Sequence, residues 1–338
     1  MYNVAVVGAT GAVGRELMQV LKDLAFPVKK LLPLASERSA GTKMDTPFGV
    51  VEVEKLAADK FEGIDVAFFC AGATISKEYA QEAVKRGALV VDNSSAFRMD
   101  PNVPLVVPEV NMHAARKHNG IIANPNCSTI IMLVPLAPIH EKYKIKRIIV
   151  STYQAVSGAG HYGMEALEVE TKDYLEGKTV VPTTLPVKSG AKHHQIAFNV
   201  IPQVDVAMPD GYTKEEHKMI LETRKIFEDD TMGICATTVR VPVFRSHSES
   251  ITIETEIPVP LQELREVLAN APGVVLQDDV DDFVYPMPYY VSGTDEVYVG
   301  RLREDPSAPN SICMWVVGDQ LRKGAATNAV QIAQKLFE

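Results

Sequence analysis

The sequence has 338 residues, of which 46% are hydrophobic and 23% charged, and its formal net charge is −9 at pH 7. This length exceeds what one hydrophobic core usually serves, so we expect two domains. The acidic balance and the scattered Lys and Arg residues argue against nucleic acid or an anionic membrane as the main partner. There is no apolar run long enough for a membrane span and no signal-peptide pattern before the first strand, so we expect a cytoplasmic protein.

The first predicted elements are a strand over residues 2–9 and an amphipathic helix over residues 13–24. The turn between them reads Gly-Ala-Thr-Gly-Ala-Val-Gly, a variant of the dinucleotide-binding fingerprint in which the middle glycine is displaced by one position. Glycines there let the backbone approach a pyrophosphate, and the helix N-terminus stabilises the anion. The predicted cofactor-binding residues of this turn are Gly8, Thr10, Gly11, Ala12, Val13 and Gly14.

The loop that follows the next strand, residues 31–35, bears on the choice of cofactor. Glu37 could accept a hydrogen bond from a ribose 2′-hydroxyl and would then imply NAD. Ser36, Arg38 and Ser39 would instead supply donors and a positive charge to a 2′-phosphate, which favours NADP. The alternative is a solvated loop in which Arg38 contacts nothing.

Near-continuous apolar runs at residues 65–71 and 88–92 predict strands that are covered on both faces, with a helix over residues 75–86 between them. This alternation indicates an α/β domain with a parallel, doubly wound sheet and a ligand at the carboxyl ends of its strands. Arg98 follows one such end and is a candidate anion ligand, although a lone arginine is more often a surface residue. Residues 103–110 and 120–124 are predicted to be further strands.

Cys127 stands just after a proline-marked break and on the first turn of an apolar segment that predicts a buried helix. The unpaired backbone N–H groups and the positive end of the helix dipole there would stabilise a thiolate, which is the nucleophilic form of cysteine. The alternative is a small apolar packing residue.

The other three cysteines are far from Cys127 and from one another, without a Cys-x-x-Cys pair, so we expect reduced thiols and neither a disulfide framework nor a zinc site. The adjacent His193 and His194 have no third ligand at a recognisable spacing. We therefore predict no metal site and assign both histidines to a surface or substrate loop.

Beyond Cys127 the sequence predicts a second domain with an antiparallel or mixed sheet. The expected strands cover residues 145–155, 196–206, 236–243, 249–257, 297–302 and 311–318. Helices are expected at residues 163–176, 213–227 and 261–269. A last helix, starting at about residue 318, has an apolar stripe and is expected to pack back onto the first domain.

The glycine-rich turn at the N-terminus, the motif Asn126-Cys127-Ser128-Thr129 and the motif from Gln154 to Gly160 together resemble aspartate-semialdehyde dehydrogenases of the bacterial NADP-dependent type. The resemblance covers the whole chain, since the helix segment from Glu215 to Lys218 and the strand segment from Arg240 to His247 follow in order. It implies a Rossmann-type NADP-binding domain of residues 1–126 plus 319–338. It also implies an α+β catalytic and dimerisation domain of residues 127–318, and a homodimer.

The resemblance also implies the role of each site residue. Cys127 looks like the nucleophile, His247 like the general acid and base, and Gln154 like the residue that orients the thioester intermediate. Arg240 and Glu215 resemble the groups that bind the substrate carboxylate and amine. Further implied ligands are Arg98, Asn126 and Lys218 for phosphate, and Gly158 and Asn328 for the cofactor.

These residue types suit the implied reaction, the reversible and NADP-dependent conversion of L-4-aspartyl phosphate to L-aspartate 4-semialdehyde in lysine, threonine and methionine biosynthesis. A thiolate can form the tetrahedral adduct and then hold the acyl group as a thioester. An imidazole with an ordinary pKa near 6.5 can take up and return the proton. An N-acetylglutamyl phosphate reductase, or a relative that binds nucleotide without catalysis, is the alternative.

Overall fold

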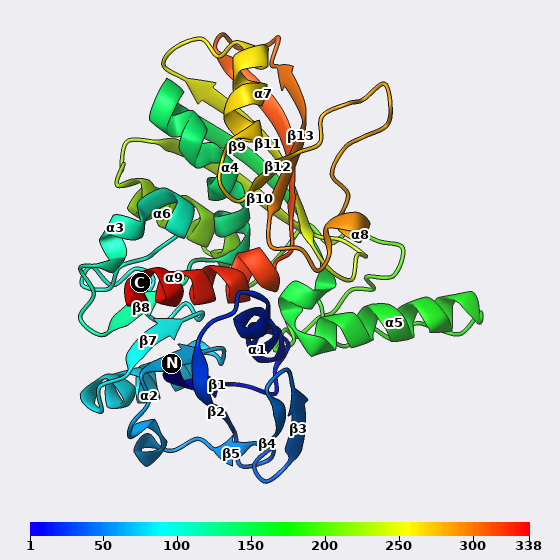
Figure 1. Ribbon diagram of the computed structural model, residues 1–338. Helices are drawn as coiled ribbons and strands as arrows, with labels where there is room; N and C mark the ends of the chain where they lie inside the picture. The colour runs from blue at the N-terminus through cyan, green and yellow to red at the C-terminus, as the bar shows by residue number, and fades with distance from the viewer. The chain divides into compact units, whose positions relative to one another are not determined.

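The computed structural model describes residues 1–338, which fold into two compact units. Unit 1 comprises residues 1–126 and 324–338, and unit 2 comprises residues 127–323. Figure 1 shows the elements in chain order, and each unit is described by itself below.

Unit 1 contains a six-stranded parallel sheet with the strand order β5-β2-β1-β6-β7-β8. Its strands are β1 (Tyr2–Val7), β2 (Val28–Ala35), β5 (Glu54–Lys55), β6 (Val66–Phe69), β7 (Leu89–Asp92) and β8 (Ile121–Ala123). Strands β6 and β7 are buried along their whole length, as expected for apolar runs in a doubly covered sheet. The registers Val7↔Phe69, Phe69↔Asp92 and Asp92↔Ala123 align the carboxyl ends of four strands at one edge.

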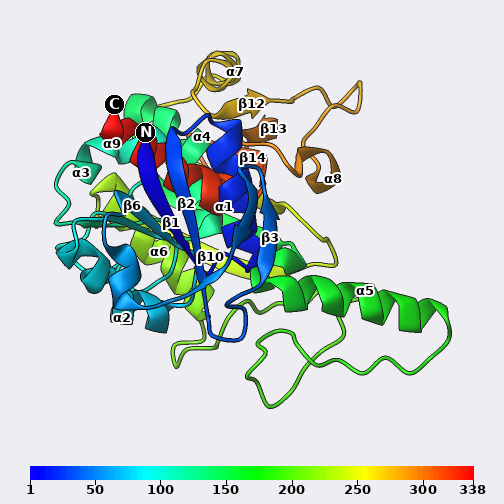
Figure 2. The same cartoon turned by 60° about the horizontal axis from the view of Figure 1, so that its bottom comes forward.

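The helices of unit 1 enclose this sheet. Helix α1 (Ala12–Asp23) packs on β1 beside the hairpin of β3 (Lys43–Thr46) and β4 (Gly49–Glu52), as Figure 2 shows. Helices α2 (Ala73–Lys85) and α3 (Pro108–Ala115) follow β6 and β7 in the chain. The terminal helix α9 (Asn328–Phe337) packs against α1 and α3, and the Phe337 ring stacks on Tyr2 at 4.3 Å between centroids. The return of the C-terminal helix to the first unit is therefore confirmed.

Unit 2 contains a six-stranded mixed sheet with the strand order β10-β9-β11-β14-β13-β12. Its strands are β9 (Ile145–Gln154), β10 (Gly233–Arg240), β11 (His247–Thr255), β12 (Val274–Leu276), β13 (Val297–Glu304) and β14 (Ser311–Gly318). Buried and accessible residues alternate along β9 and β11, so the sheet has one covered face and one open face. The predicted α/β fold class with a mixed second sheet is confirmed.

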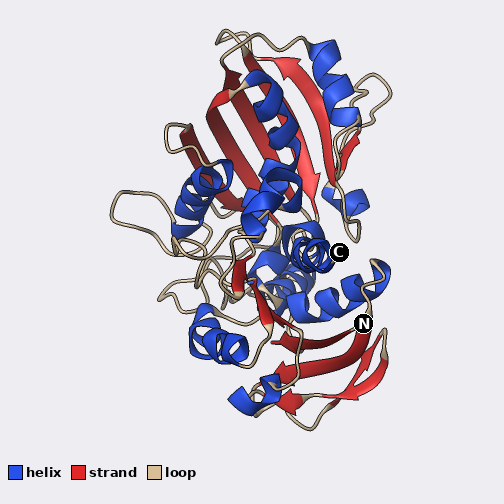
Figure 3. Cartoon of the chain, turned by 60° about the vertical axis from the view of Figure 1, so that its left-hand side comes forward, coloured by secondary structure: helices blue, strands red, loops and turns tan.

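Three helices cover the buried face of this sheet, as Figure 3 shows. They are α4 (Cys127–Tyr143), α6 (Lys214–Phe227) and α7 (Leu261–Ala269). The first turns of α4 are buried on all sides, which explains the unbroken apolar run after Cys127. Helix α5 (His161–Leu175) follows a short 3₁₀ turn over Val156–Ala159, and the four-residue helix α8 (Pro288–Val291) precedes β13.

Three local predictions are wrong. Residues 103–110 form only one bridge, from Leu105 to Ala123, because Pro108 lacks an N–H group and begins helix α3. Residues 196–206 contribute one bridge, from Ile201 to Arg240, because positive φ angles at Phe198 and Asp205 interrupt extended structure. The last helical segment begins later than residue 318, with a π-helix over Arg322–Thr327 that leads into α9.

Candidate active site

Three polar residues stand together at the end of three neighbouring strands of unit 2. Gln154 ends β9, Arg240 ends β10 and pairs with Gln154, and His247 begins β11 beside them. Because β9 and β10 are parallel and β11 is antiparallel to β9, the three side chains lie on one edge and on the covered face. All three are buried.

The side-chain amide of Gln154 links this edge to two helices. Its Nε2 atom donates to Ser128 Oγ at 2.9 Å and to Glu215 Oε1 at 3.3 Å. Ser128 follows Cys127 in the first turn of α4, and Glu215 lies in the first turn of α6. Gln154 therefore joins the segment that carries the cysteine to the segment that carries an acidic side chain.

Cys127 is the first residue of α4 and is partly accessible. Backbone N–H groups of a first helical turn have no partner within the helix, so the sulfur lies beside a region of positive potential. The Arg240 guanidinium interacts electrostatically with Cys127, which further favours a negative sulfur. Cys70 is different: burial raises the pKa of its thiol, so it stays protonated.

Arg240 is a buried cation whose hydrogen bonds are only partly satisfied by the protein. Its Nη1 donates to the carbonyl oxygen of Ala155 at 2.7 Å, whereas its Nε has no partner. Burial lowers the pKa of Arg240, and the nearby charges of Glu215, Cys127 and Asp205 oppose that shift. A buried guanidinium with free donors is suited to an anionic ligand that binds two of its N–H groups.

Glu215, Lys218 and Asp205 form a second charged group. Lys218 Nζ contacts Asp205 Oδ2 at 2.8 Å and Glu215 Oε2 at 3.0 Å. Burial alone would lower the pKa of Lys218, but the two carboxylates outweigh it and raise the pKa overall. Sequence reasoning missed Asp205, because it lies in the segment that was predicted to be a regular strand.

His247 is completely buried and is held by one hydrogen bond to the backbone. Its Nδ1 accepts the N–H of Ala155 at 3.1 Å, and its Nε2 has no partner. Burial and then Arg240 lower the pKa of His247 to about 3, against a smaller opposing effect of Glu215. The expectation of an ordinary imidazole pKa is therefore wrong, since the buried site and a neighbouring cation disfavour the charged ring.

Gly158 makes room for the side chains of Arg240 and His247. A Cβ atom at this position would lie 2.8 Å from Arg240 Nη1 and 3.2 Å from His247 Cε1. The structure therefore places Gly158 directly against Arg240 and His247.

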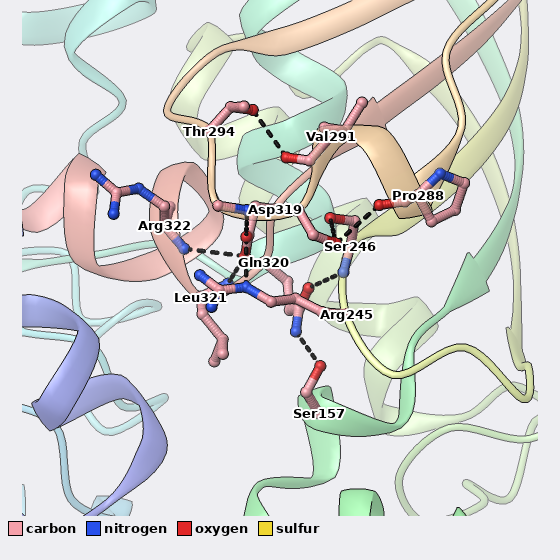
Figure 4. Close-up of polar contacts among 12 residues, drawn as sticks. Ser157, Arg245, Ser246, Pro288, Val291, Thr294, Asp319, Gln320, Leu321 and Arg322 are labelled. Atoms are coloured by element: carbon pink, nitrogen blue, oxygen red, sulfur yellow. Dashed lines mark hydrogen bonds and ion pairs between the residues drawn. The ribbon is translucent and has the colours of Figure 1, made fainter.

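A buried network at the end of β14 connects the segments that contain Ser157 and Ser246 (Figure 4). Gln320 donates through Nε2 to Ser157 Oγ, and its Oε1 accepts the N–H of Ser246 at 2.8 Å. Asp319, fully buried, accepts from Arg245 Nε and from the N–H of Gly293. The residues that directly precede Gly158 and His247 are thus tied to one side-chain amide.

A second polar row lies one step behind the first on the covered face of the sheet. Thr238, Thr152 and Glu249 are cross-strand neighbours on β10, β9 and β11, and all are fully buried. Neither carboxyl oxygen of Glu249 has a hydrogen-bond partner, and burial raises the pKa of this group well above its usual value. Glu249 was not among the predicted site residues, although strict alternation from His247 points it inward.

Arg98 and Asn126, two of the predicted phosphate ligands, lie in unit 1 and are buried, whereas Lys218 belongs to unit 2. Arg98 donates through Nε to the carbonyl oxygen of Asn124 at 2.9 Å and through Nη2 to that of Asn93 at 2.8 Å. Both carbonyls follow the carboxyl ends of strands, so Arg98 is fixed at the edge where a parallel sheet binds ligands.

Asn328 is buried at the same edge of unit 1. Its Nδ2 donates to Asn124 Oδ1 at 2.7 Å and to the carbonyl oxygen of Val106 at 2.9 Å. The first residue of α9 is therefore fixed to the loop that follows β8.

The glycine-rich turn of unit 1 is shaped for a dinucleotide. Gly8 has φ +84°, and a Cβ there would lie 2.9 Å from the backbone of Cys70. A Cβ at Gly14 would lie 2.4 Å from the carbonyl oxygen of Gly8, so helix and strand approach closely only without a side chain. Gly11 caps α1 with no side chain over the helix N-terminus. The residues Thr10, Ala12 and Val13 complete this turn, and the whole cradle fits a bound pyrophosphate.

In the loop after β2, the carboxylate of Glu37 forms an exposed ion pair with Lys55 at 3.0 Å. Ser36 and Arg38 are exposed, and Ser39 is partly exposed. Because Glu37 is paired with Lys55, Arg38 is the charged side chain of this loop that is available to bind a ligand.

No group of three or more His, Cys, Asp or Glu side chains in the chain is arranged to hold a metal ion. His193 and His194 lie in the loop between α5 and α6, where the backbone N–H of His194 donates to Leu185. None of the helices combines the length and the hydrophobicity that a membrane span requires.

Comparison with known proteins gives consistent matches over the whole chain. The semialdehyde dehydrogenase NAD binding domain matches residues 3–118, and the semialdehyde dehydrogenase dimerisation domain matches residues 136–323. An aspartate-semialdehyde dehydrogenase from Aquifex aeolicus is 53% identical over 340 residues, with 100% of this chain and 98% of the relative covered. The enzyme of that name from Bacillus subtilis is 49% identical, with 99% and 97% covered.

Among solved structures, aspartate semialdehyde dehydrogenase II from Vibrio cholerae, complexed with ASA, matches with a TM-score of 0.94 at 44% identity. The match covers 100% of this chain and 98% of that one. These findings confirm the predicted family resemblance and the nucleotide-binding character of the first unit.

Proposed function

The chain belongs to the aspartate-semialdehyde dehydrogenase family, and from that premise we propose how its residues carry out the reaction. The enzyme is an oxidoreductase that converts L-4-aspartyl phosphate reversibly to L-aspartate 4-semialdehyde and phosphate, within lysine, threonine and methionine biosynthesis. Cytoplasmic localisation is part of the proposal. We assign residues 1–126 with 319–338 to the cofactor domain and residues 127–318 to the catalytic and dimerisation domain; these bounds differ from the compact units only at residues 319–323, which belong to unit 2.

The observation that carries this proposal is the position of Cys127. It begins helix α4, interacts electrostatically with Arg240, and is followed by Ser128, which Gln154 binds. A thiolate in that position attacks the acyl carbon and holds it as a thioester, while Gln154 keeps the start of α4 in place. His247 is assigned as the general acid and base, which takes the proton from the thiohemiacetal oxygen and returns it in the reverse direction.

Arg240 and Glu215 supply the specificity for an amino acid. The substrate α-carboxylate binds the guanidinium of Arg240, whose Nε lacks a protein partner. The substrate ammonium binds Glu215, whose carboxylate is already held by Gln154 and Lys218. Both groups are buried, so a substrate without the carboxylate would leave the Nε donor of Arg240 unsatisfied, and a substrate without the ammonium would lose its charge interaction with Glu215.

Phosphate binding is assigned to Arg98, Asn126 and Lys218. Arg98 is oriented by two backbone carbonyls, and Lys218 is kept fully charged by Glu215 and Asp205. Such fixed cations stabilise the attacking or leaving phosphate without reorganising.

The proposed cofactor is NADP, whose reduced form, NADPH, would supply the hydride in the reductive direction. The glycine turn with residues 8–14 holds the pyrophosphate, and Gly158 and Asn328 line the cofactor site. Ser36, Arg38 and Ser39 bind the 2′-phosphate, and the pairing of Glu37 with Lys55 supports this choice over NAD. Arg38→Ala should raise the KM for NADPH at least tenfold and leave that for NADH nearly unchanged; an equal change for both would contradict the assignment.

The proposed assembly is a homodimer. The family description of residues 136–323 is a dimerisation domain. The open face of the unit 2 sheet supports the proposal, since Ile149 and Tyr153 are each 38% exposed there and Tyr153 packs against Trp315 at 5.4 Å.

The experiment that tests the proposed function compares two aldehydes under identical conditions. With phosphate and NADP, L-aspartate 4-semialdehyde should give rapid formation of NADPH, and N-acetylglutamate semialdehyde should give very little. The second substrate lacks the free amine that Glu215 binds, so a preference for it would support the alternative acyl-phosphate reductase. Absence of turnover with either aldehyde would support a non-catalytic relative.

A further inference from the structure

Strand β10 lies at one edge of the unit 2 sheet, so one side of its backbone has no neighbouring strand. The free side of an edge strand presents N–H and C=O groups that need other partners when they are buried. Near the end of β10, Arg240 exchanges both backbone hydrogen bonds with Ile201, at 2.8 and 2.9 Å. The N–H of Thr238 donates to Glu216 Oε1 at 2.8 Å. The segment from Ile201 to Glu216 therefore covers this part of the edge.

Glu216 is the third residue of α6, and it is buried. Its Oε2 accepts the N–H of Thr213, the N-cap residue, at 2.7 Å, and Thr213 Oγ1 accepts the N–H of Glu216 at 3.3 Å. This arrangement is a capping box, which satisfies N–H groups at the start of a helix. The box uses one carboxylate oxygen of Glu216, and the other oxygen bonds the strand. One side chain therefore caps α6 and fastens it to β10.

Both ends of this link lie next to groups that are assigned to the substrate. Glu215 directly precedes Glu216 in the first turn of α6. Arg240 lies two residues after Thr238, on the same face of β10. The Arg240 side chain is held independently of α6, since its Nη1 donates to the carbonyl oxygen of Ala155. The bond from Thr238 to Glu216 therefore sets where the Glu215 carboxylate lies relative to the Arg240 guanidinium.

The side-chain contacts of Glu215 fix its position less firmly. Its Oε1 accepts from Gln154 Nε2 at 3.3 Å, and both of these atoms belong to side chains that can rotate. Its Oε2 accepts from Lys218, but Lys218 belongs to the same helix and would move with it. The bond of Glu216 is shorter, at 2.8 Å, and it ends on the backbone of Thr238. Glu216 is thus the firmer attachment of this turn to the strand.

We propose that Glu216 is a positioning residue for substrate specificity, which holds the Glu215 carboxylate at the distance from Arg240 that an α-amino acid requires. The inference rests on the proposed function, in which Arg240 binds the α-carboxylate and Glu215 binds the ammonium. Both substrate groups are attached to one carbon, so the two protein groups must converge on it. A displacement of about 1 Å in a positioned group typically costs about 10² in rate. Loss of Glu216 weakens the selection for the ammonium, while binding of the carboxylate remains.

The test compares L-aspartate 4-semialdehyde with succinate semialdehyde, which has the same aldehyde and carboxylate but no amine. The measured quantity is the ratio of the two kcat/KM values at saturating phosphate and NADP. Glu216→Ala should lower this ratio at least about tenfold, with kcat/KM for succinate semialdehyde within about threefold of wild type. Glu216→Gln has one acceptor for two N–H groups and should give an intermediate ratio. This variant preserves the size of the side chain, so it carries the test if Glu216→Ala does not fold.

Thr213→Ala is the matched control, because it removes the cap hydroxyl of the same helix and leaves the bond from Thr238 to Glu216. It should lower the unfolding temperature by a few °C and keep the wild-type ratio. A wild-type ratio in the Glu216 variants, or an equal fall in kcat/KM for both aldehydes, would overturn the proposal.

Glu215→Ala separates this outcome from failure of the proposed function. It should lower the ratio at least as much as Glu216→Ala does, because it removes the carboxylate itself. A wild-type ratio in Glu215→Ala would mean that Glu215 does not bind the ammonium, and the proposed function of that residue would fail. A lowered ratio in Glu215→Ala together with a wild-type ratio in the Glu216 variants would refute the positioning role alone.

Discussion

Gly158 shows how a missing side chain can shape a site. Both Arg240 Nη1 and His247 lie so close to its backbone that any Cβ would be in steric conflict with them. The sequence presented Gly158 as part of a glycine-rich turn and, through the resemblance, as a cofactor ligand. The close approach to Arg240 could not be predicted, because it depends on the pairing of β9 with β10.

Gly158→Ala should therefore lower kcat/KM about a hundredfold, because a displacement of catalytic groups by about 1 Å has effects of that size. The unfolding temperature should change little, since the turn lies beside a site rather than within a core. The matched control is Gly72→Ala, where no atom lies within 4 Å of the new Cβ and φ is not positive. Steady-state kinetics of both variants decide the matter, and full activity of Gly158→Ala would refute the steric role.

The other site residues differ in how far the sequence alone could identify them. Cys127 stands at the start of a predicted helix, and its position alone suggested a nucleophile. Gln154, Arg240 and His247 were assigned through the family resemblance, since Arg240 lies within the predicted strand 236–243 and His247 precedes the predicted strand 249–257. Asp205 stands in an irregular segment with a positive φ angle, and its contact with Lys218 depends on tertiary structure alone. No local signal in the sequence could have identified it.

At the scale of elements, the strands were predicted best where their burial is regular. Strands β6, β7, β9 and β14 follow apolar or alternating runs, and the structure contains them near the expected positions. The prediction was wrong at residues 103–110 and 196–206, where proline or left-handed backbone overrides apolar composition.

Hydrogen bonds of Gln320, which follows β14, connect the turn after β9 to the residue that precedes β11 (Figure 4). Gln320 is buried, and it bonds Ser157 and the backbone of Ser246, which has φ +72°. A serine in this left-handed conformation needs support from its surroundings. The network therefore fixes the start of β11, and with it His247.

Gln320→Ala should lower kcat about tenfold and reduce the unfolding temperature by a few °C, because two buried hydrogen bonds are lost. Gln262→Ala, on the exposed surface of α7, is the control and should leave both quantities unchanged. The measurements are kinetics and differential scanning calorimetry. A loss of stability with wild-type kcat would mean that the network supports the fold but not the position of His247.

At the scale of the whole molecule, the buried carboxyl group of Glu249 makes the stability of the folded protein depend on pH. Its folded pKa is raised by burial, so the folded state holds the proton more tightly than the unfolded chain. Its contribution to stability is therefore fully present below the unfolded pKa of about 4.5 and is lost as the pH rises towards the folded pKa.

Glu249→Gln removes this titration while preserving the size of the side chain. The difference in unfolding temperature between Glu249→Gln and wild type should grow in favour of the variant as the pH rises from about 4.5 to 8. Calorimetry at several pH values measures it, with the exposed Glu168→Gln as a control that shows no such trend. A difference that stays constant with pH would show that Glu249 is already ionised in the folded protein.

The sequence predicts two domains of different kinds because its hydrophobic pattern changes along the chain. Near-continuous apolar strands alternate with helices in the first part, whereas several strands of the second part alternate apolar and polar residues. The assignment of chemistry to the second unit depends above all on one covalent step at Cys127. That step can be observed directly in a rapid-quench experiment with L-aspartate 4-semialdehyde and NADP in the absence of phosphate.

Under these conditions the enzyme should release about one NADPH per active site in a burst, and mass spectrometry of the acid-quenched digest should find an aspartyl adduct on the peptide that contains Cys127. Without phosphate the thioester has no acceptor other than water, so it should accumulate. A burst that persists in Cys127→Ala, or an adduct on Cys70, Cys235 or Cys313 instead, would contradict the account.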